Sequence, residues 1–246
     1  MAQAAGARVD HRTGTIVLPL DQFGVSNAEI RTVDYAINLL LRACMAANGH
    51  TFEAIDHRAG PMTTDRRYGV WIESEVARHG YQEPPPTGPQ RRLMEQNSAP
   101  MTGAEEATRR SCLGAAPVRA LHLPDLHAQR AAAASYEQAL ASPPGRDLLD
   151  RWRRCLHDEG VTAAPPGSDG TWTPAGVSST DIARSRRIAL VDVGCKQRLK
   201  LVAGLADIEG EIQREMVRKD LVRLRAERQR VERVLVSAGE VIEDLG

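Results

Sequence analysis

The fold of this chain is decided first by residues 25–49, which read VSNAEIRTVDYAINLLLRACMAANG. Ser26 and Glu29 match a capping box, in which each side chain accepts a hydrogen bond from the other residue's backbone amide. Apolar residues then recur at the three- and four-residue spacing of one helix face, and Asn48-Gly49 follows as a stop signal. The stretch therefore predicts a helix over 27–48.

The last third of the chain predicts a longer helical region, because no proline occurs between Asp181 and Leu245. A capping sequence at 178–181 opens the region, and a heptad repeat marks its end. The repeat places Leu224, Val231, Ala238 and Leu245 in one seam position, and Leu221, Arg228, Leu235 and Ile242 in the other. Glycines offer the places where such a helix bends, at Gly194, Gly204 and Gly210.

We expect the distal part of this helix to be free for a protein partner, while its base packs on the other helices. A charged residue at a seam position weakens a two-stranded coiled coil, so Arg228 favours a monomer, with a dimer as the alternative. The expected partner-binding residues are Arg228, Val231, Leu235 and Ile242.

Shorter helices alternate with loops over the rest of the chain. Helices are predicted at 72–79, 105–113, 126–141 and 146–158, and irregular segments at 50–72, 83–101 and 165–176. Pro143-Pro144-Gly145 is expected to break the helical structure between two of them. The first residues form a loose lead-in with a short strand at 15–20, and deletion of 1–14 is expected to change the stability little.

These patterns define the fold class as mainly α. With two Phe, four Tyr and three Trp in 246 residues, the core rests on aliphatic side chains, which suit helix packing better than a β-sandwich. We expect a multi-helix bundle with a long, coiled-coil-like C-terminal helix and irregular Pro/Gly-rich loops. Its predicted parts are a lead-in over 1–25, a disulfide-tied helical domain over 26–176 and the C-terminal helix over 177–246.

Charge and hydropathy argue against two classes of partner. Lys and Arg number 32, as do Asp and Glu, so the chain lacks the basic excess of a typical nucleic-acid-binding protein. No stretch approaches the roughly 20 apolar residues that a membrane span needs. The N-terminus lacks the basic and apolar regions of a signal peptide. Either the protein is not exported, or the sequence is a mature form whose leader has been removed.

The four cysteines favour disulfides over metal binding or catalysis. Zinc sites use closely spaced pairs of cysteines, and no such pair occurs among Cys44, Cys112, Cys155 and Cys195. No neighbouring His or Asn pattern supports a thiol nucleophile. Four cysteines allow three disulfide pairings, and the alternative is four reduced, buried thiols in a cytosolic protein.

A faint internal repeat favours one of these pairings. Residues 41–49 (LRACMAANG) and 152–160 (WRRCLHDEG) both end a predicted helix, and in both a cysteine stands five residues before a glycine. One further cysteine follows each copy, at Cys112 and Cys195. The repeat therefore favours the pairs Cys44–Cys112 and Cys155–Cys195.

Ordered segments along most of the chain carry a resemblance to a known family. They are Leu18-Pro19-Leu20-Asp21, Arg42-Ala43-Cys44-Met45 with Gly49, Arg67-Tyr68-Gly69-Val70, Ala77-Arg78-His79-Gly80-Tyr81, Trp152-Arg153-Arg154-Cys155 with Gly160, and Asp192-Val193-Gly194-Cys195-Lys196. In these segments the chain resembles secreted proteins and lipoproteins common in actinobacteria. The resemblance implies export and a helical fold, and it implies no reaction. The chain departs from the family in lacking a leader and in matching only partly around Cys112.

Other residues with catalytic or binding chemistry are better explained as ordinary surface features. The spacing of His122 and His127 fits no zinc motif, and residues 167–170 lack the context of a phosphate-binding loop. Paired carboxylates at Asp158/Glu159, Glu105/Glu106 and Glu209/Glu211 lie in ordinary charged helical stretches. The basic stretch 214–233 is typical of an exposed coiled-coil flank, with an anionic polymer as the alternative ligand. We predict no catalytic residue, no metal ligand and no cofactor.

The sequence thus favours a non-enzymatic, extracytoplasmic helical protein that works by binding or as a scaffold, with an unknown protein partner and no nucleic acid. One alternative is a cell-envelope enzyme, such as a hydrolase, with an unrecognised site. Another is a cytoplasmic coiled-coil regulatory protein, if Met1 is the natural start.

Overall fold

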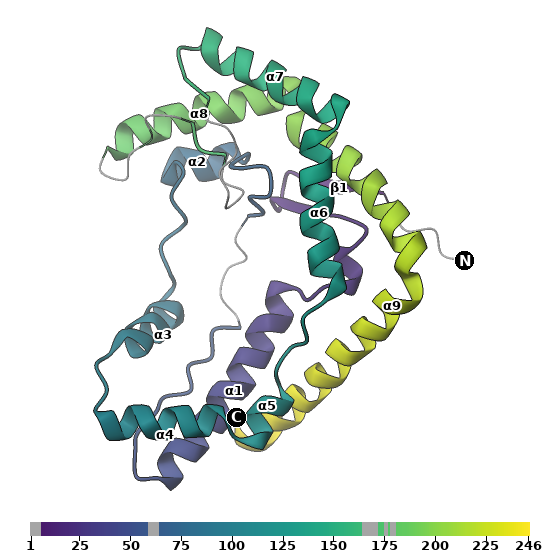
Figure 1. Cartoon of the computed structure of the whole chain (residues 1–246). Helices are drawn as coiled ribbons and strands as arrows, with labels where there is room; N and C mark the ends of the chain where they lie inside the picture. Colours follow the sequence, from purple (N-terminus) through teal and green to yellow (C-terminus); the bar gives the residue numbers. More distant parts are fainter. Residues whose placement is uncertain (1–5, 59–63, 164–171, 175–176, 178–180) are drawn as a thin grey trace. The chain divides into compact units, whose positions relative to one another are not determined.

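A computed structural model of the chain describes residues 6–58, 64–163, 172–174, 177 and 181–246. The described part is mainly α-helical, which confirms the predicted fold class (Figure 1). The helices are α1 (Asn27–Ala47), α2 (Glu73–His79), α3 (Gly88–Ser98), α4 (Gly103–Leu113), α5 (Ala116–Ala120), α6 (His127–Ala141), α7 (Pro143–Asp158), α8 (Ile182–Leu199) and α9 (Leu201–Leu245). A 3-10 turn, η1 (Asp21–Phe23), and two short strands, β1 (Arg8–Asp10) and β2 (Thr15–Val17), precede them.

The chain divides into two compact units that are each discontinuous in sequence. Unit 1 contains residues 1–22, 62–84 and 128–220, and unit 2 contains residues 23–61, 85–127 and 221–246. The chain therefore passes between the units after residues 22, 61, 84, 127 and 220. These passages fall elsewhere than the predicted boundaries at 25 and 176.

Unit 1 is organised around α8, which packs against both α2 and α7 (Figure 1). Its core contains aromatic side chains as well as aliphatic ones. These are Tyr68, Trp71, Trp152 and Trp172, each at most 2% exposed. Aromatic residues are few in the chain, but this core buries four of them.

The N-terminal hairpin belongs to the core of unit 1. Strands β1 and β2 pair antiparallel with Val9 opposite Ile16, and the turn is closed by Gly14 at φ 67°. Ile16 is buried, and Val9 and Ala7 pack against the same cluster. A Cβ atom at Gly210 would lie 2.9 Å from the Cβ of Ala7, so α9 approaches this segment closely. For the described residues 6–14, the expectation of a loose lead-in is wrong, because they supply a paired strand and apolar cover.

We therefore expect deletion of residues 1–14 to lower the free energy of unfolding by about 2 kcal/mol, through lost apolar burial and strand hydrogen bonds. Chemical denaturation of the truncated and full-length chains measures the difference. Arg8→Ala changes an exposed side chain on the same strand and should have little effect. An unchanged denaturation midpoint for the truncated chain would instead show that residues 1–14 contribute little to stability.

Unit 2 is organised around α1, which packs against α4 and α5. The predicted capping box is present: the Glu29 amide donates to Ser26 Oγ at 3.3 Å, and the Ser26 amide donates to Glu29 Oε2 at 2.8 Å. The helix ends at Ala47, and Gly49 follows with φ 78°. The prediction of a helix over 27–48 is confirmed to within one residue.

Two other predictions about local structure need correction. Residues 83–101 were expected to be an extended loop, but they include α3, which begins with a capping box between Thr87 and Gln90. Pro143 and Pro144 were expected to break the structure, but they form the first turn of α7 after the cap Ser142. Proline fits a first helical turn because the amides there have no partner within the helix.

The C-terminal helical region is interrupted, although not at its glycines. Lys200 adopts φ 49° and separates α8 from α9, and Asp220 has non-helical dihedral angles where α9 passes from unit 1 to unit 2. Gly204 instead allows the Leu148 side chain to pack closely against α9, since a Cβ atom at this position would lie 2.9 Å from Leu148. Asp181 caps α8 by accepting from the Arg184 amide at 2.9 Å. The other predicted capping residues, 178–180, and most of the irregular segment 165–176 lie outside the described residues.

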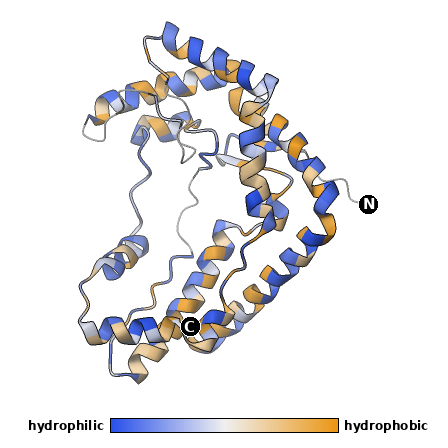
Figure 2. Ribbon diagram, in the orientation of Figure 1, coloured by the Kyte–Doolittle hydropathy of each residue, from blue (hydrophilic) through white to orange (hydrophobic). Residues whose placement is uncertain are grey.

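The distal part of α9 is not free, which corrects the expectation for its end. Val231 is fully buried, and Leu235 and Ile242 pack with Val33 and Ala36 of α1. Arg228 forms an ion pair with Glu29 at 2.6 Å and donates to the Gly24 carbonyl at 3.0 Å. The apolar heptad positions of α9 need another helix to cover them, and this helix is α1 of the same chain. Figure 2 shows apolar and polar residues interleaved along α9.

Candidate functional site

The structure pairs the four cysteines within the units. Cys44 of α1 is bonded to Cys112 of α4 in unit 2, and their Cα atoms are 5.9 Å apart. Cys155 of α7 is bonded to Cys195 of α8 in unit 1, with Cα atoms 5.8 Å apart. This is the pairing that the sequence repeat favours. Each unit thus holds one disulfide between two of its own helices.

A buried ion pair flanks Cys195 on α8, because Asp192 lies three residues before this cysteine and Lys196 follows it directly. Lys196 Nζ donates to Asp192 Oδ2 at 2.9 Å and to the Val70 carbonyl at 2.9 Å. Asp192 also accepts from Trp152 Nε1 at 2.8 Å and from the Tyr81 hydroxyl at 2.9 Å. Asp192 is fully buried and Lys196 is 2% exposed. The carboxylate therefore has three donors, which offset the cost of taking its charge out of water.

The surroundings of Lys196 are apolar and tightly packed. Burial lowers the pKa of Lys196, while the charge and hydrogen bond of Asp192 act in the opposite direction. The ammonium faces the rings of Trp152 and Trp172, whose centroids lie 5.7 Å and 5.8 Å from Nζ. Gly69 has φ 78°, and a Cβ there would lie 2.7 Å from Nζ, so only glycine fits beside the lysine.

A second buried network centres on Glu209 of α9. Its carboxylate is fully buried and accepts from Tyr68 Oη at 2.6 Å, Ser135 Oγ at 2.8 Å and Gln213 Nε2 at 2.9 Å. Arg67 donates to both of its oxygens, and the guanidinium also donates to the Ala132 carbonyl at 2.8 Å. Gln213 extends the network, because its Oε1 accepts from the Leu20 amide at 2.9 Å.

One short segment, residues 67–70, links the two networks. Arg67 and Tyr68 bind Glu209, whereas the Val70 carbonyl accepts from Lys196. Segments quoted above for the family resemblance meet here, since they contain Tyr81, Trp152 and the Asp192–Lys196 stretch. The sequence analysis assigned no role to these polar residues. The available signal was the four-residue spacing of Asp192 and Lys196, which is also the spacing of countless exposed helix pairs.

The arrangement is suited to stability rather than to turnover. A catalytic group must reach substrate, but Asp192, Lys196, Glu209 and Gln213 are at most 2% exposed and are hydrogen-bonded to protein groups. Such saturated buried networks fix the packing of the helices that carry them. The two networks therefore position α8 and the proximal part of α9 within unit 1.

The other candidate residues are also accounted for by local contacts. Glu209 is buried, whereas Glu211 has a largely exposed side chain, so they do not form a carboxylate pair. Glu105 caps α4, and Glu159 pairs with Arg198 at 2.8 Å. In the basic stretch 214–233, several arginines pair with glutamates three or four positions away, as at Arg223–Glu227, and Arg228 also pairs with Glu29. Within the described residues, His, Cys, Asp and Glu form no group of three that could hold a metal ion.

The buried tyrosines predict how stability depends on alkaline pH. Burial, together with the charge of Glu209, raises the pKa of Tyr68, and burial with the charge of Asp192 raises that of Tyr81. Above the ordinary value of 10.0, the unfolded chain loses these phenolic protons while the folded chain keeps them. The unfolded state then binds fewer protons, so we expect the free energy of unfolding to fall as the pH rises above 10.0.

Denaturation at a series of pH values, with tyrosinate absorbance recorded in parallel, tests this expectation. Tyr68→Phe and Tyr81→Phe should each reduce the slope of the alkaline loss. Ionisation of all four tyrosines before any loss of helix would contradict it.

The chain matches no protein-family model, and no curated protein and no solved structure is significantly similar to it. Among the described residues, no helix is both long enough and apolar enough to span a membrane.

Proposed function

We propose that this protein is an extracytoplasmic, non-enzymatic helical protein that acts by binding, like a member of the actinobacterial secreted proteins and lipoproteins that it resembles. The observation that supports this proposal is the presence of one disulfide in each unit. Disulfides persist in oxidising compartments and are rare in the reducing cytosol. Both bonds join residues that lie far apart in the sequence, so they act as long-range covalent links.

The buried networks support the non-enzymatic part of the proposal. The chain places its most unusual ionisable groups, Lys196, Asp192 and Glu209, in the interior, where they bind each other or other protein groups. Burying ionic groups of this kind costs desolvation free energy, and their hydrogen bonds specify one packing arrangement of the surrounding helices. The interior of unit 1 is therefore a rigid support, and the proposed binding activity belongs to the surface of the protein.

Thiol mapping in the native host tests the compartment. Cells are treated with an alkylating agent before lysis, and the unreduced protein is digested and analysed by mass spectrometry. We expect linked peptides containing Cys44 with Cys112 and Cys155 with Cys195, from protein in the envelope or medium fraction. Four alkylated cysteines in a cytosolic fraction would overturn the extracytoplasmic assignment.

Cross-linking in intact cells followed by purification tests the mode of action. We expect a reproducible envelope component to be captured, and the same component to bind the purified chain directly. Hydrolysis of an envelope polymer by the purified chain, abolished by one substitution that leaves the fold intact, would overturn the non-enzymatic assignment.

A further inference from the structure

The two disulfides have similar burial but different electrostatic surroundings. In each bond one cysteine is buried, Cys112 or Cys195, and the other is half-buried, Cys44 or Cys155. A guanidinium lies against the sulfurs of Cys155 and Cys195. In the described part of the chain, no side chain makes a comparable contact with the sulfurs of Cys44 or Cys112.

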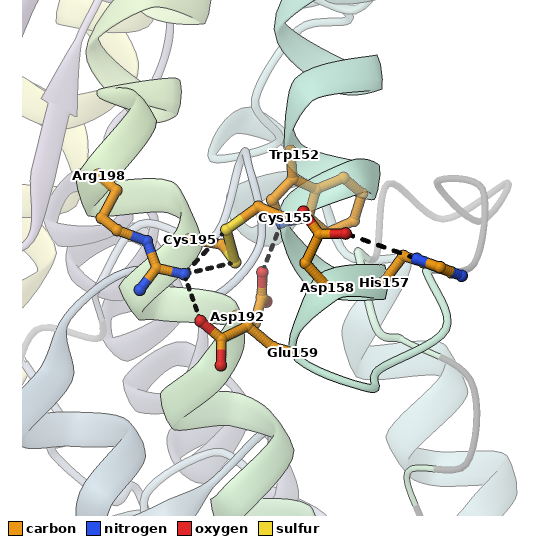
Figure 3. The surroundings of a disulfide bond; sticks show 8 residues. All are labelled: Trp152, Cys155, His157, Asp158, Glu159, Asp192, Cys195 and Arg198. Atoms are coloured by element: carbon orange, nitrogen blue, oxygen red, sulfur yellow. Dashed lines mark hydrogen bonds and ion pairs between the residues drawn. A yellow bond between two sulfur atoms is a disulfide. The ribbon is translucent and has the colours of Figure 1, made fainter.

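The guanidinium belongs to Arg198, one turn after Cys195 on α8. Its Nη2 atom lies 3.0 Å from Cys155 Sγ and 3.4 Å from Cys195 Sγ, and it also donates to Glu159 Oε1 at 2.8 Å (Figure 3). The Arg198 side chain is 58% exposed and that of Glu159 is 44% exposed. The charged group that touches both sulfurs is therefore open to solvent. Nearby, His157 pairs only with Asp158 in Figure 3, at 3.7 Å.

We propose that the Cys155–Cys195 bond is a thiol–disulfide exchange site for a dithiol reductant, with Arg198 as its positioning residue. The direction of attack follows from which of the two cysteines is more exposed. Cys155 is half-buried, so a thiolate attacks its Sγ, while Cys195 Sγ is released as a thiolate beside the guanidinium. The new sulfur–sulfur bond joins Cys155 to the reductant, and the Cys195 thiolate takes up a proton from solvent.

The second step completes the reduction. The other thiolate of the dithiol attacks the reductant's own sulfur in the mixed disulfide, and Cys155 Sγ leaves as a thiolate. In the disulfide-bonded structure this sulfur lies 3.0 Å from Arg198 Nη2, so the guanidinium is beside it. Cys155 then takes up a proton from solvent. The dithiol has become a disulfide by losing two electrons, and the protein disulfide has become two thiols. Reduction removes the covalent link between α7 and α8 and leaves the Cys44–Cys112 bond unchanged.

Arg198 and Glu159 have opposite effects in this scheme. The guanidinium attracts the attacking thiolate and stabilises each departing thiolate, so it accelerates both steps. Glu159 lies on the same guanidinium and partly neutralises it, so it slows them. A purely structural role for this ion pair predicts something different, because loss of either partner would then loosen the same contact and speed up reduction.

The test uses the oxidised full-length chain and dithiothreitol at fixed pH and low salt. Samples are quenched with an alkylating agent, and the extent of reduction of each disulfide is followed by peptide mass spectrometry. We expect the Cys155–Cys195 bond to be reduced about fivefold or more faster than the Cys44–Cys112 bond, given one adjacent cation. We expect Arg198→Gln to slow its reduction about fivefold and Glu159→Gln to accelerate it about twofold.

Control variants separate this effect from general charge or loosening. Arg154 is exposed and lies next to Cys155 on α7, and Arg154→Gln should leave the rate nearly unchanged. High salt should reduce the difference between the wild type and Arg198→Gln, since exposed charges are screened. The rate for the Cys44–Cys112 bond should not change in any of these variants.

Three results would overturn the proposal. The first is equal or faster reduction of Cys155–Cys195 in Arg198→Gln. The second is a change in the same direction for Arg198→Gln and Glu159→Gln. The third is reduction of Cys44–Cys112 ahead of Cys155–Cys195 in the wild type. Because Glu159→Gln removes an acid from a helix C-terminus, where the dipole disfavours negative charge, it should fold normally and keep the test decisive.

Discussion

Asp192→Asn is expected to lower the free energy of unfolding by about 3–5 kcal/mol, because it leaves Lys196 as a buried charge without a counter-ion. Asparagine has nearly the size of aspartate, so lost packing contributes little. The side-chain amide of the asparagine would also face three hydrogen-bond donors. These are Trp152 Nε1, the Tyr81 hydroxyl and Lys196 Nζ, which all donate to the carboxylate of Asp192. Denaturant unfolding of the oxidised protein measures the loss.

A matched control and a double variant make this result specific. Asp150→Asn breaks an exposed ion pair with Arg153 on α7, which should cost no more than about 0.5 kcal/mol. Adding Lys196→Met to Asp192→Asn removes the unpaired charge, so the double variant should be more stable than Asp192→Asn alone. A double variant that loses the sum of the two single losses would show that the buried charge is not the cause.

The same variant should change the pH dependence in a defined direction. Burial lowers the pKa of Lys196 in the folded chain, and loss of Asp192 removes the group that opposes this shift. Below its ordinary value of 10.5, the unfolded lysine keeps a proton that the folded lysine tends to release. The unfolded state of Asp192→Asn therefore binds more protons, so its stability should rise as the pH approaches that value.

Removing either disulfide is the second large expected effect. The bonded residues are 68 apart in unit 2 and 40 apart in unit 1, and closing loops of these lengths stabilises the folded state by about 4 kcal/mol through the entropy of the unfolded chain. We expect Cys44→Ala/Cys112→Ala and Cys155→Ala/Cys195→Ala each to lose a stability of that order. Both measured losses also include burial, because Cys112 and Cys195 are each at most 1% exposed.

Hydrogen exchange can show where each loss falls. Amides of α1 and α4 should lose protection when the Cys44–Cys112 bond is removed, and amides of α7 and α8 when the Cys155–Cys195 bond is removed. Each double variant is the control for the other. Equal loss of protection in both units with either variant would show that the chain unfolds as one cooperative body, rather than as two units with separate covalent links.

Local signals explain what the sequence could predict. The start of α1 was predictable because Ser26 and Glu29 act within one turn, and the disulfide pairing because two similar helix ends precede two cysteines. The start of α3 carried the same kind of signal at Thr87 and Gln90, but the run of prolines before it favoured an extended loop. The break at Lys200 had no signal, because a non-glycine residue with positive φ is held there by its surroundings.

Long-range contacts explain what the sequence could not predict. Arg67 and Glu209 are 142 residues apart, and neither has neighbours that mark it as buried. The spacing of Asp192 and Lys196 indicates an ordinary surface pair until the tryptophans are placed over it. The heptad seam of α9 correctly indicated that this face needs cover. The sequence left open whether another chain or α1 supplies it, and the packing of Leu235 and Ile242 with Val33 and Ala36 now shows that α1 covers this end of the helix.

The interleaving of the two units has a consequence for biosynthesis. Unit 1 requires residues up to 220, and unit 2 requires residues from 23 to 246, so neither unit can be completed on the ribosome before nearly the whole chain has been made. Cys44 likewise waits for Cys112, and Cys155 for Cys195. We therefore expect the nascent chain to contain neither complete unit until synthesis is almost finished, and the export proposed above would use a chain that has not yet folded.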